Sequence, residues 1–244
     1  MNDKVKKVLK PLLDSNGKIN IPKGCKKVKL DVGLSCNAPH SEIWLEGNND
    51  TCVYGFEPNP YNIKDIKSFT PEKKIWPIHL NPERIDNNFF IIEAALSDGE
   101  PRDTNFYCTE DDPGTSSMFE PIRQNERGFK LKDVVTVPVI TLKDFFDIFP
   151  WEKIPYIDQL KVDAQSADFD IIRGCGDYLS EKIVYLDVEI TTHNAYKKYE
   201  NPQEFHTYIL KSGFEIISVG GNCSYYNRKF SNIKDSIDYK FLND

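Results

Sequence analysis

Short apolar runs of the kind that form buried strands alternate along the chain with segments whose apolar residues recur at helical spacing. The strand-like runs cover 28–32, 52–57, 89–96, 134–139, 159–163 and 183–190, and the helix-like segments cover 41–46, 59–66, 141–148, 166–173 and 201–210. Uniformly apolar strands are typical of a sheet that is covered on both faces. The alternation therefore predicts one doubly wound α/β domain with a mostly parallel sheet and helices on both faces.

The two ends of the chain depart from this alternation. The last two strand-like runs, 214–219 and 223–230, are joined by a connection too short to hold a helix, so we expect them to pair antiparallel. Residues 1–27 precede the first strand and are expected to form a helical extension, because Val5 and Leu9 lie on one face of a short helix.

A polar stretch interrupts the pattern between 97 and 133, with one strand-like piece at 105–108. Segments of this length without regular structure are uncommon in compact domains and are often functional. Aromatic and hydroxyl side chains gather in this insertion, among them Phe106, Ser116 and Met118. They suit a lid over a substrate, and they equally suit a small hydrophobic cluster beneath a long loop.

The composition narrows the class of protein. The 244 residues carry 31 Lys and Arg against 38 Asp and Glu, which gives a net charge of −7, and 39% of them are hydrophobic. These values are typical of one globular domain spanning 1–244. The acidic balance argues against nucleic acid or an anionic membrane as a partner. The charged N-terminus and the lack of any run of about 20 apolar residues predict neither a signal peptide nor a membrane span.

The cysteines bear on the compartment. They are scattered, with no C-x-x-C pair, at Cys25, Cys36, Cys52, Cys108, Cys175 and Cys223. This spacing indicates neither a zinc site nor a disulfide framework, so we expect free thiols in a reducing cytoplasm. The frequent Asn, Lys and Ile are typical of an AT-rich genome, such as that of a virus or a host-associated microbe, and for a virus the cytoplasm would be the host's.

Three strand ends carry residues suited to a nucleoside. The first strand ends in Asp31-Val32-Gly33, the second in Glu57 and the third in Ala95-Leu96-Ser97. In doubly wound sheets ligands bind beyond the carboxyl ends of the strands, where a glycine lets the chain approach and an acidic side chain can accept both ribose hydroxyls. A plain tight turn with a solvent-facing Glu57 fits the same residues. A nucleotide-dependent oxidoreductase fits less well, because G-x-G-x-x-G is absent.

Several motifs follow one another in the order of a known family. They occupy 31–33, 54–60, 94–98, 114–117, 137–142, 160–163 with 168–174, and 213–214. Over about 28–230 the chain resembles the FkbM-type S-adenosylmethionine-dependent methyltransferases. The Phe-Glu-Pro-Asn motif at 56–59 and the Lys-Val-Asp motif at 161–163 are the most specific parts of this resemblance.

The resemblance implies a Rossmann-like class I methyltransferase fold, with a seven-stranded, mostly parallel sheet whose last strand is antiparallel. It implies S-adenosylmethionine as methyl donor and a sugar hydroxyl of a glycan or glycoside as acceptor, which the insertion 97–133 would cover. Asp31 and Gly33 would line the methionine part, Glu57 the ribose, Ala95, Leu96 and Ser97 the adenine, and Asp163 would face the methyl group. The implied cofactor-binding set is completed by Ser35, Asn37, Pro58 and Asn59.

Two positions depart from the family pattern. Asn37 stands where the first loop usually has a second glycine, and Ala164-Gln165-Ser166 stands where the family prefers Val-Glu-Gly. The lost carboxylate at Gln165 argues against a centre of two carboxylates. Both departures leave open an alternative function, a catalytically inactive methyltransferase-like binding or scaffold domain.

Methyl transfer to a sugar hydroxyl needs a base or a metal ion nearby, because such a hydroxyl is a poor acid. The candidates at the ends of the strand-like runs 159–163 and 183–190 are Asp163, Glu189 and His193. His193 titrates in the useful pH range, although a loop histidine that only bonds to the backbone fits equally. Asp163 and Glu189 together are candidate ligands for Mg²⁺, which prefers oxygen ligands.

Overall fold

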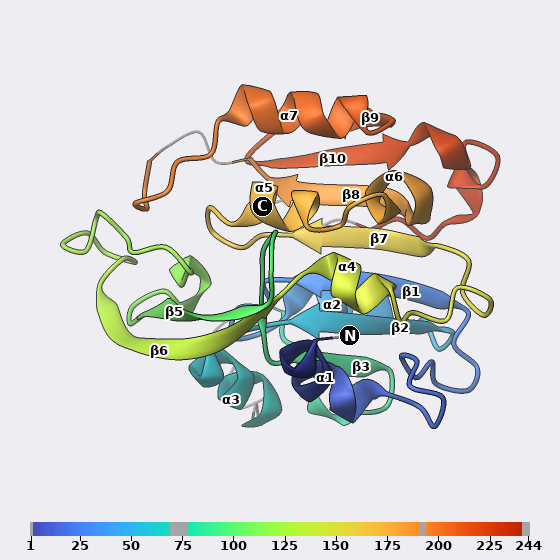
Figure 1. Ribbon diagram of the computed structural model, residues 1–244, viewed down its shortest axis with the longest axis horizontal. Coiled ribbons are helices and arrows are strands. Elements are labelled where there is room, and N and C mark those ends of the chain that lie inside the picture. The colour runs from blue at the N-terminus through green and yellow to red at the C-terminus, as the bar shows by residue number, and fades with distance from the viewer. Residues whose placement is uncertain (1, 69–77, 191–193, 241–244) are drawn as a thin grey trace.

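The computed structural model describes residues 2–68, 78–190 and 194–240. It contains a seven-stranded sheet in the order β3-β2-β1-β7-β8-β10-β9 and a three-stranded sheet in the order β4-β6-β5 (Figure 1). The strands of the larger sheet are β1 (Lys27–Val32), β2 (Thr51–Phe56), β3 (Phe89–Ile92), β7 (Ile157–Val162), β8 (Ile183–Glu189), β9 (Phe214–Ser218) and β10 (Asn222–Asn227). Those of the smaller sheet are β4 (Ala95–Leu96), β5 (Arg102–Thr109) and β6 (Leu131–Ile140).

The strand directions confirm the predicted fold class. From β3 through β8 neighbouring strands of the larger sheet run parallel. The last strand, β10, lies between β8 and β9 and is antiparallel to both. The structure therefore has the expected seven-stranded sheet, in which the glycine pair before β10 leaves no room for a crossover helix.

Helices cover both faces of the sheet. They are α1 (Asp3–Leu9), α2 (Pro39–Leu45), α3 (Pro60–Ser68), α4 (Leu142–Phe146), α5 (Asp168–Arg173), α6 (Tyr178–Lys182) and α7 (Pro202–Lys211). In Figure 1, α1, α4 and α6 lie in front of the larger sheet and α2 lies behind it. Helix α4 begins with a capping box between Thr141 and Asp144, and it ends at Phe146, two residues before the end that the sequence predicts. None of the helices within the described residues is long and apolar enough to span a membrane.

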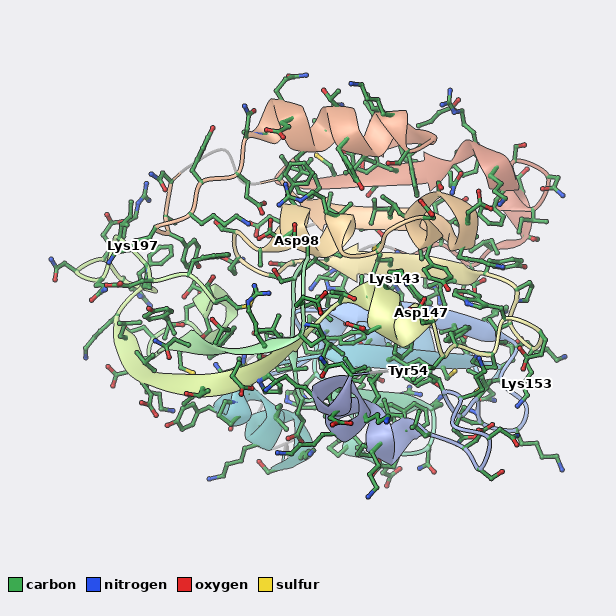
Figure 2. All side chains as sticks on the ribbon, in the orientation of Figure 1. Tyr54, Asp98, Lys143, Asp147, Lys153 and Lys197 are labelled. Carbon is green, nitrogen blue, oxygen red and sulfur yellow. The ribbon has the colours of Figure 1, made fainter. Side chains whose placement is uncertain are left out.

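The N-terminal extension packs on the front of the sheet. Val5 and Leu9 of α1 are fully buried in the main core. The hydroxyl of Tyr54, on β2, donates to the backbone carbonyl of Asn20 at 2.5 Å (Figure 2). The extension thus covers the strand that leads to Glu57.

The predicted continuous strand at 89–96 is wrong, because it is broken in two. β3 ends at Ile92, a tight turn follows in which the Ala94 amide donates to the Ile92 carbonyl, and β4 then pairs with β6 in the second sheet. Both halves are buried. An apolar run therefore cannot reveal the point at which the chain leaves one sheet for another.

The stretch 97–133 holds more strand than its polar sequence predicts. β5 starts at Arg102 and pairs antiparallel with β6 over most of its length. The first half of β5 is largely exposed, so its residues are polar although they form a ladder. In Figure 1 this hairpin lies beyond the carboxyl ends of β1, β2 and β7.

The rear face of the sheet carries a buried polar row that the apolar pattern conceals. Lys29, Gln159 and Asp187 are each at most 1% exposed, and the Gln159 amide donates to Asp187 at 2.7 Å. The C-terminal segment covers this row, since the Tyr239 hydroxyl donates to Asp187 and the Lys240 carbonyl accepts from Gln159. The two charged side chains, Lys29 and Asp187, can be buried here because Gln159 accepts a hydrogen bond from the first and donates one to the second.

Gly174, at the end of α5, is predicted to tolerate no side chain. A Cβ there would lie 2.3 Å from the backbone carbonyl oxygen of Ser97, which neither element can avoid without moving. Gly174→Ala should therefore lower the free energy of unfolding by about 1–3 kcal/mol, measured by urea denaturation. Gly221→Ala is the matched control, because a Cβ at Gly221 meets nothing within 4 Å. Equal stability of the two variants would contradict this packing.

Candidate functional site

A cleft lies at the carboxyl ends of β1, β2 and β7, beneath residues of the insertion. Its floor comes from the loops that follow these strands and from α5. Its walls include seven of the predicted site residues: Gly33, Ser35, Glu57, Pro58, Ala95, Leu96 and Asp163. This is the edge at which a doubly wound sheet binds its ligand.

The backbone at Gly33 determines how closely the two central strands end together. Gly33 has φ +81°, and a Cβ there would lie 1.8 Å from the backbone oxygen of Asp163. The Asp163 amide in turn donates to the carbonyl of Val32 at 3.1 Å. Gly33 therefore has to be a glycine, because the backbone that follows β7 occupies the space of a Cβ. The same residue also lines the cleft.

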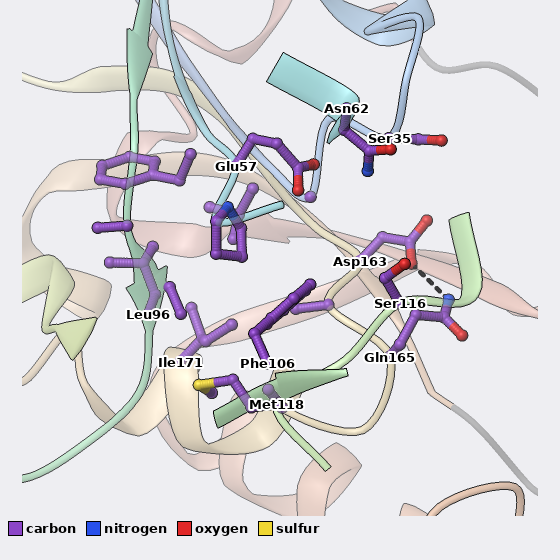
Figure 3. A pocket seen from close by; sticks show the side chains of 18 of the residues that line it. Ser35, Glu57, Asn62, Leu96, Phe106, Ser116, Met118, Asp163, Gln165 and Ile171 are labelled. Carbon is purple, nitrogen blue, oxygen red and sulfur yellow. Dashed lines mark hydrogen bonds between the residues drawn. The ribbon is translucent and has the colours of Figure 1, made fainter. Parts of the chain in front are cut away.

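Glu57 brings a buried carboxyl group to the cleft from the end of β2. It is 3% exposed, and its Oε1 accepts a hydrogen bond from the backbone N–H of Asn59 at 2.9 Å. Burial raises the pKa of Glu57 to about 7, although the hydrogen bond from Asn59 opposes the shift. Asn62, one turn into the helix that follows, also lines the cleft, and its Oδ1 is buried with no partner among the described residues. Figure 3 shows the two side chains beside each other.

The other side of the cleft is apolar. Figure 3 shows this apolar group apart from Glu57 and Asn62. The apolar side chains come from β4, β5, the segment 113–118 and α5, and they include Leu96, Phe106, Met118 and Ile171. Two of them, Phe106 and Met118, belong to the insertion. The cleft therefore offers hydrogen-bonding groups on one side and apolar side chains on the other, a combination typical of sites for amphipathic small molecules.

A row of charged residues lies under the loop of β1. The Nζ of Lys161 lies 3.4 Å from Oδ1 of Asp31 and 3.7 Å from Oδ2 of Asp163, and it donates to the Gly33 carbonyl at 2.7 Å. Burial lowers the pKa of Lys161, but Asp31 and Asp163 together raise it above its ordinary value. Of the three side chains only that of Asp163 is substantially exposed, at 33%. Asp163 is thus the charge that this row presents to the cleft.

Gln165 joins two of the predicted catalytic residues. Its Nε2 donates to Oδ1 of Asp163 at 2.9 Å and to Oε2 of Glu189 at 2.9 Å. Burial raises the pKa of Glu189 well above its ordinary value, and the nearby carboxylates of Asp163 and Asp168 raise it further. The cleft therefore ends in two neighbouring carboxyl groups that share one amide.

The predicted Mg²⁺ site at Asp163 and Glu189 is not supported. Both carboxyl groups already accept hydrogen bonds from the Gln165 side-chain amide, whose N–H groups bring partial positive charge to the pair. Among the residues that the structure describes, no group of three or more His, Cys, Asp and Glu side chains is arranged to hold a metal ion. We derive no metal step from this pair.

The segment 113–118 forms the roof of the cleft and is tied to its floor. The Tyr196 hydroxyl donates to the Thr115 carbonyl at 2.7 Å, and the Ser117 hydroxyl donates to the Gln165 carbonyl at 2.7 Å. From the other side the side-chain amide of Asn59 donates to the Ser116 hydroxyl at 3.2 Å. The Gly-Thr-Ser-Ser motif of the sequence is thus the part of the insertion that closes over the cleft.

Five predicted site residues lie outside the cleft lining. Asp31 and Ser97 are buried beside it, Asn59 braces the roof, and Glu189 is reached through Gln165. The Asn37 amide donates to the Ile78 carbonyl at 2.9 Å. His193 lies outside the described residues.

Asn62 and Gln165 are polar cleft residues that the sequence reasoning did not assign to the site. Asn62 lies in the first turn of α3, five residues after Glu57. A polar side chain so close to the end of β2 could have been identified from the sequence. Gln165 drew attention only as a missing carboxylate. Its role depends on Glu189, 24 residues away in the sequence, so no local signal identifies it.

A comparison with protein families agrees with this geometry. The model described as "Methyltransferase FkbM domain" matches residues 32–216, from the end of β1 into β9. The chain belongs to the FkbM methyltransferase family. The matched region of this FkbM domain contains the whole cleft lining, from Val32 to Ile171. The seven-stranded sheet is accordingly the class I methyltransferase fold that the sequence predicts.

Solved structures show more distant likenesses to this FkbM domain. One is a crystal structure of a fibrillarin/Nop5p complex, with 11% identity, coverage of 92% of this chain and 82% of that chain, and a TM-score of 0.41. Another is the Methanococcus jannaschii fibrillarin, a pre-rRNA processing protein, with 10% identity, coverage of 88% and 74%, and a TM-score of 0.39. No curated protein sequence matches the chain. Likenesses this distant carry no argument about the substrate.

The buried Glu57 makes the stability of the ligand-free protein depend on pH. Its pKa rises from 4.5 to about 7 on folding, so between these values the folded protein binds more protons than the unfolded chain, and its stability falls as the pH rises. Glu57→Gln removes this charge and should raise the free energy of unfolding at pH 8 by up to about 3 kcal/mol, with almost no difference at pH 4. Urea denaturation at both pH values measures it.

The matched control for this prediction is Glu83→Gln, because Glu83 is an exposed glutamate on the surface. We expect this variant to follow the wild-type protein at both pH values. A Glu57→Gln variant that gains nothing at pH 8 would show that the carboxylate is not desolvated in the cleft.

Proposed function

We propose that this FkbM-family protein is an S-adenosylmethionine-dependent O-methyltransferase that acts on an uncharged hydroxyl group, most simply a sugar hydroxyl of a glycan or glycoside. The observation that carries the proposal is the buried carboxyl group of Glu57, which faces the cleft at the end of β2. A buried acid of this kind is costly unless a ligand binds it. Vicinal ribose hydroxyls are donors suited to such a carboxylate.

The residues of the cleft fit the parts of this cofactor. Glu57 and Asn62, whose Oδ1 has no partner among the described residues, suit the ribose hydroxyls. Leu96, Phe106 and Ile171 offer apolar surface to an adenine ring. When bound, S-adenosylmethionine would supply an electrophilic methyl group, and the partly exposed carboxylate of Asp163 suits the positive charge that accompanies it.

Asp163 is also the proposed proton acceptor. A hydroxyl that takes a methyl group must lose its proton, and a carboxylate with a third of its surface exposed at the cleft can receive it. Glu189 lies on the same amide, and His193 stays a second candidate base. The buried Lys161 is compensated by Asp31, so this end of the cleft offers no free cation among its described lining residues. It therefore favours an uncharged acceptor over an anionic one.

We propose that the insertion separates the place where the cofactor binds from the place where the acceptor binds. Its roof segment 113–118 lies over the cofactor end, while Tyr196 and the 194–200 segment lie against it from the side of Glu189. Lys197, labelled in Figure 2, pairs with Glu120 at 2.5 Å and holds that segment to the insertion. We propose that these two joined segments border the acceptor end of the cleft.

Binding of the demethylated cofactor tests the proposal directly. Wild-type protein should bind S-adenosylhomocysteine in a calorimetric titration, and Glu57→Gln should weaken this affinity by roughly 10- to 100-fold, the effect of losing a charge-assisted hydrogen bond. Glu83→Gln should bind as the wild-type protein does. A wild-type protein that binds no S-adenosylhomocysteine would rule out the proposed cofactor.

Methyl transfer is tested on a panel of glycans and glycosides, followed by mass spectrometry for the gain of one CH₂ group. Asp163→Asn should reduce the rate on the responding acceptor by roughly 10²- to 10⁴-fold, because the general base is lost. Asp103→Asn, an exposed aspartate on β5, serves as control. Cofactor binding without transfer to any acceptor would favour the alternative of a non-catalytic binding domain.

A further inference from the structure

Gln165 makes more contacts at the end of the cleft than its place in a loop would suggest. Its amide nitrogen donates to Asp163 and Glu189, and its backbone carbonyl accepts from Ser117. Its Oε1 lies 3.0 Å from the Tyr196 hydroxyl, which shares its one proton between this oxygen and the Thr115 carbonyl. Both hydrogens of the amide and its oxygen are therefore used. The side chain connects the ends of β7 and β8 to the roof of the cleft.

The backbone of Gln165 is held in an unfavourable conformation. Its φ is +53° and that of Ser166 is +74°, both in the left-handed region that residues other than glycine seldom adopt. The carboxylate of Asp168 stabilises this turn, because its two oxygens accept from the amides of Ala164 and Ser166. Strained turns persist where the surrounding contacts over-determine them, and they concentrate at functional sites.

An amide suits this position better than a carboxylate. Asp163 and Glu189 already place two acidic groups side by side, and a third would add repulsion in a buried site. An amide instead offers one N–H to each of them. With Oδ1 of Asp163 on Gln165 and Oδ2 near Lys161, both oxygens of that carboxylate have a partner, which fixes its rotation.

We propose that Gln165 is a positioning residue, whose amide holds the carboxyl groups of Asp163 and Glu189 together and ties them through Tyr196 to the roof of the cleft. This inference rests on the proposed function in one respect, because Asp163 is the proton acceptor there. In that step the acceptor oxygen would bond to the methyl carbon as the bond from that carbon to the sulfur of S-adenosylmethionine breaks, S-adenosylhomocysteine would leave, and the acceptor's O–H proton would pass to Asp163. Gln165 takes no part in the bond changes. It determines where the carboxylate stands.

The contact can be tested in the ligand-free protein by following side-chain carboxyl groups with carbon-detected NMR as the pH is changed. Glu189, assigned with Glu189→Gln, should titrate above neutrality in the wild-type protein. The groups that face it are Asp163 and Lys161 from β7, Asp168 from α5, and Tyr196. Since these stay in place, a change at Gln165 isolates the contribution of its amide.

Gln165→Met removes the amide at similar length, so the Glu189 titration should move to higher pH by roughly one pH unit, the effect of losing one hydrogen bond to a charged group. Gln165→Glu should move it in the same direction, because a further negative charge disfavours ionisation. The control is Gln124→Met, since Gln124 is an exposed glutamine whose amide donates to a carboxylate, Glu120, away from the cleft. It should leave Glu189 unchanged.

A merely structural role would lower the unfolding temperature of the variants without moving the Glu189 titration, and that result would overturn the proposal. If Gln165→Met fails to fold, Gln165→Leu takes its place, because it also removes the amide and adds no charge. Calorimetry with S-adenosylhomocysteine on the wild-type protein separates this inference from the proposed function. Binding with no shift of Glu189 overturns only the positioning role, and a shift without binding overturns only the cofactor assignment.

Discussion

The loops that follow β1 and β7 meet at Gly33 and Asp163, and the site depends on this backbone contact. Without a Cβ at Gly33, the carbonyl of Asp163 can occupy the space that a side chain would fill. The same junction brings Lys161 between Asp31 and Asp163. β1 and β7, which are far apart in the sequence, thereby bring the partly exposed carboxylate of Asp163 to the cleft. The buried ammonium group of Lys161 balances its charge.

Burial of acidic groups is the second constraint. Glu57 is buried and Glu189 is partly buried, and loss of contact with water raises the pKa of both side chains. The two sites differ in how they are supported. Glu57 faces the cleft beside an amide with an unpartnered oxygen, whereas Glu189 shares the Gln165 amide with Asp163. Glu57 therefore presents its carboxyl group to the cleft, whereas Glu189 is hydrogen-bonded within the protein.

Much of the fold and half of the site could be predicted from the sequence, because the signals are local. A buried strand between two helices is apolar whatever its partner, so the order of elements follows from periodicity. Glu57 and Asp163 each stand at the end of such a strand, and parallel strands bring their carboxyl ends to one edge of the sheet. This is why the cleft has the expected lining from Gly33 to Leu96.

What the sequence by itself determined, then, is the succession of strands and helices and the edge of the sheet at which the site lies. The tertiary structure alone decided where the run 89–96 breaks between two sheets, and that Asp31 faces a lysine rather than the cleft. It also decided that Gln165 joins two carboxyl groups. The physical reason is the same in each case. The partner of a strand or of a polar side chain comes from elsewhere in the chain, and only folding brings the two together.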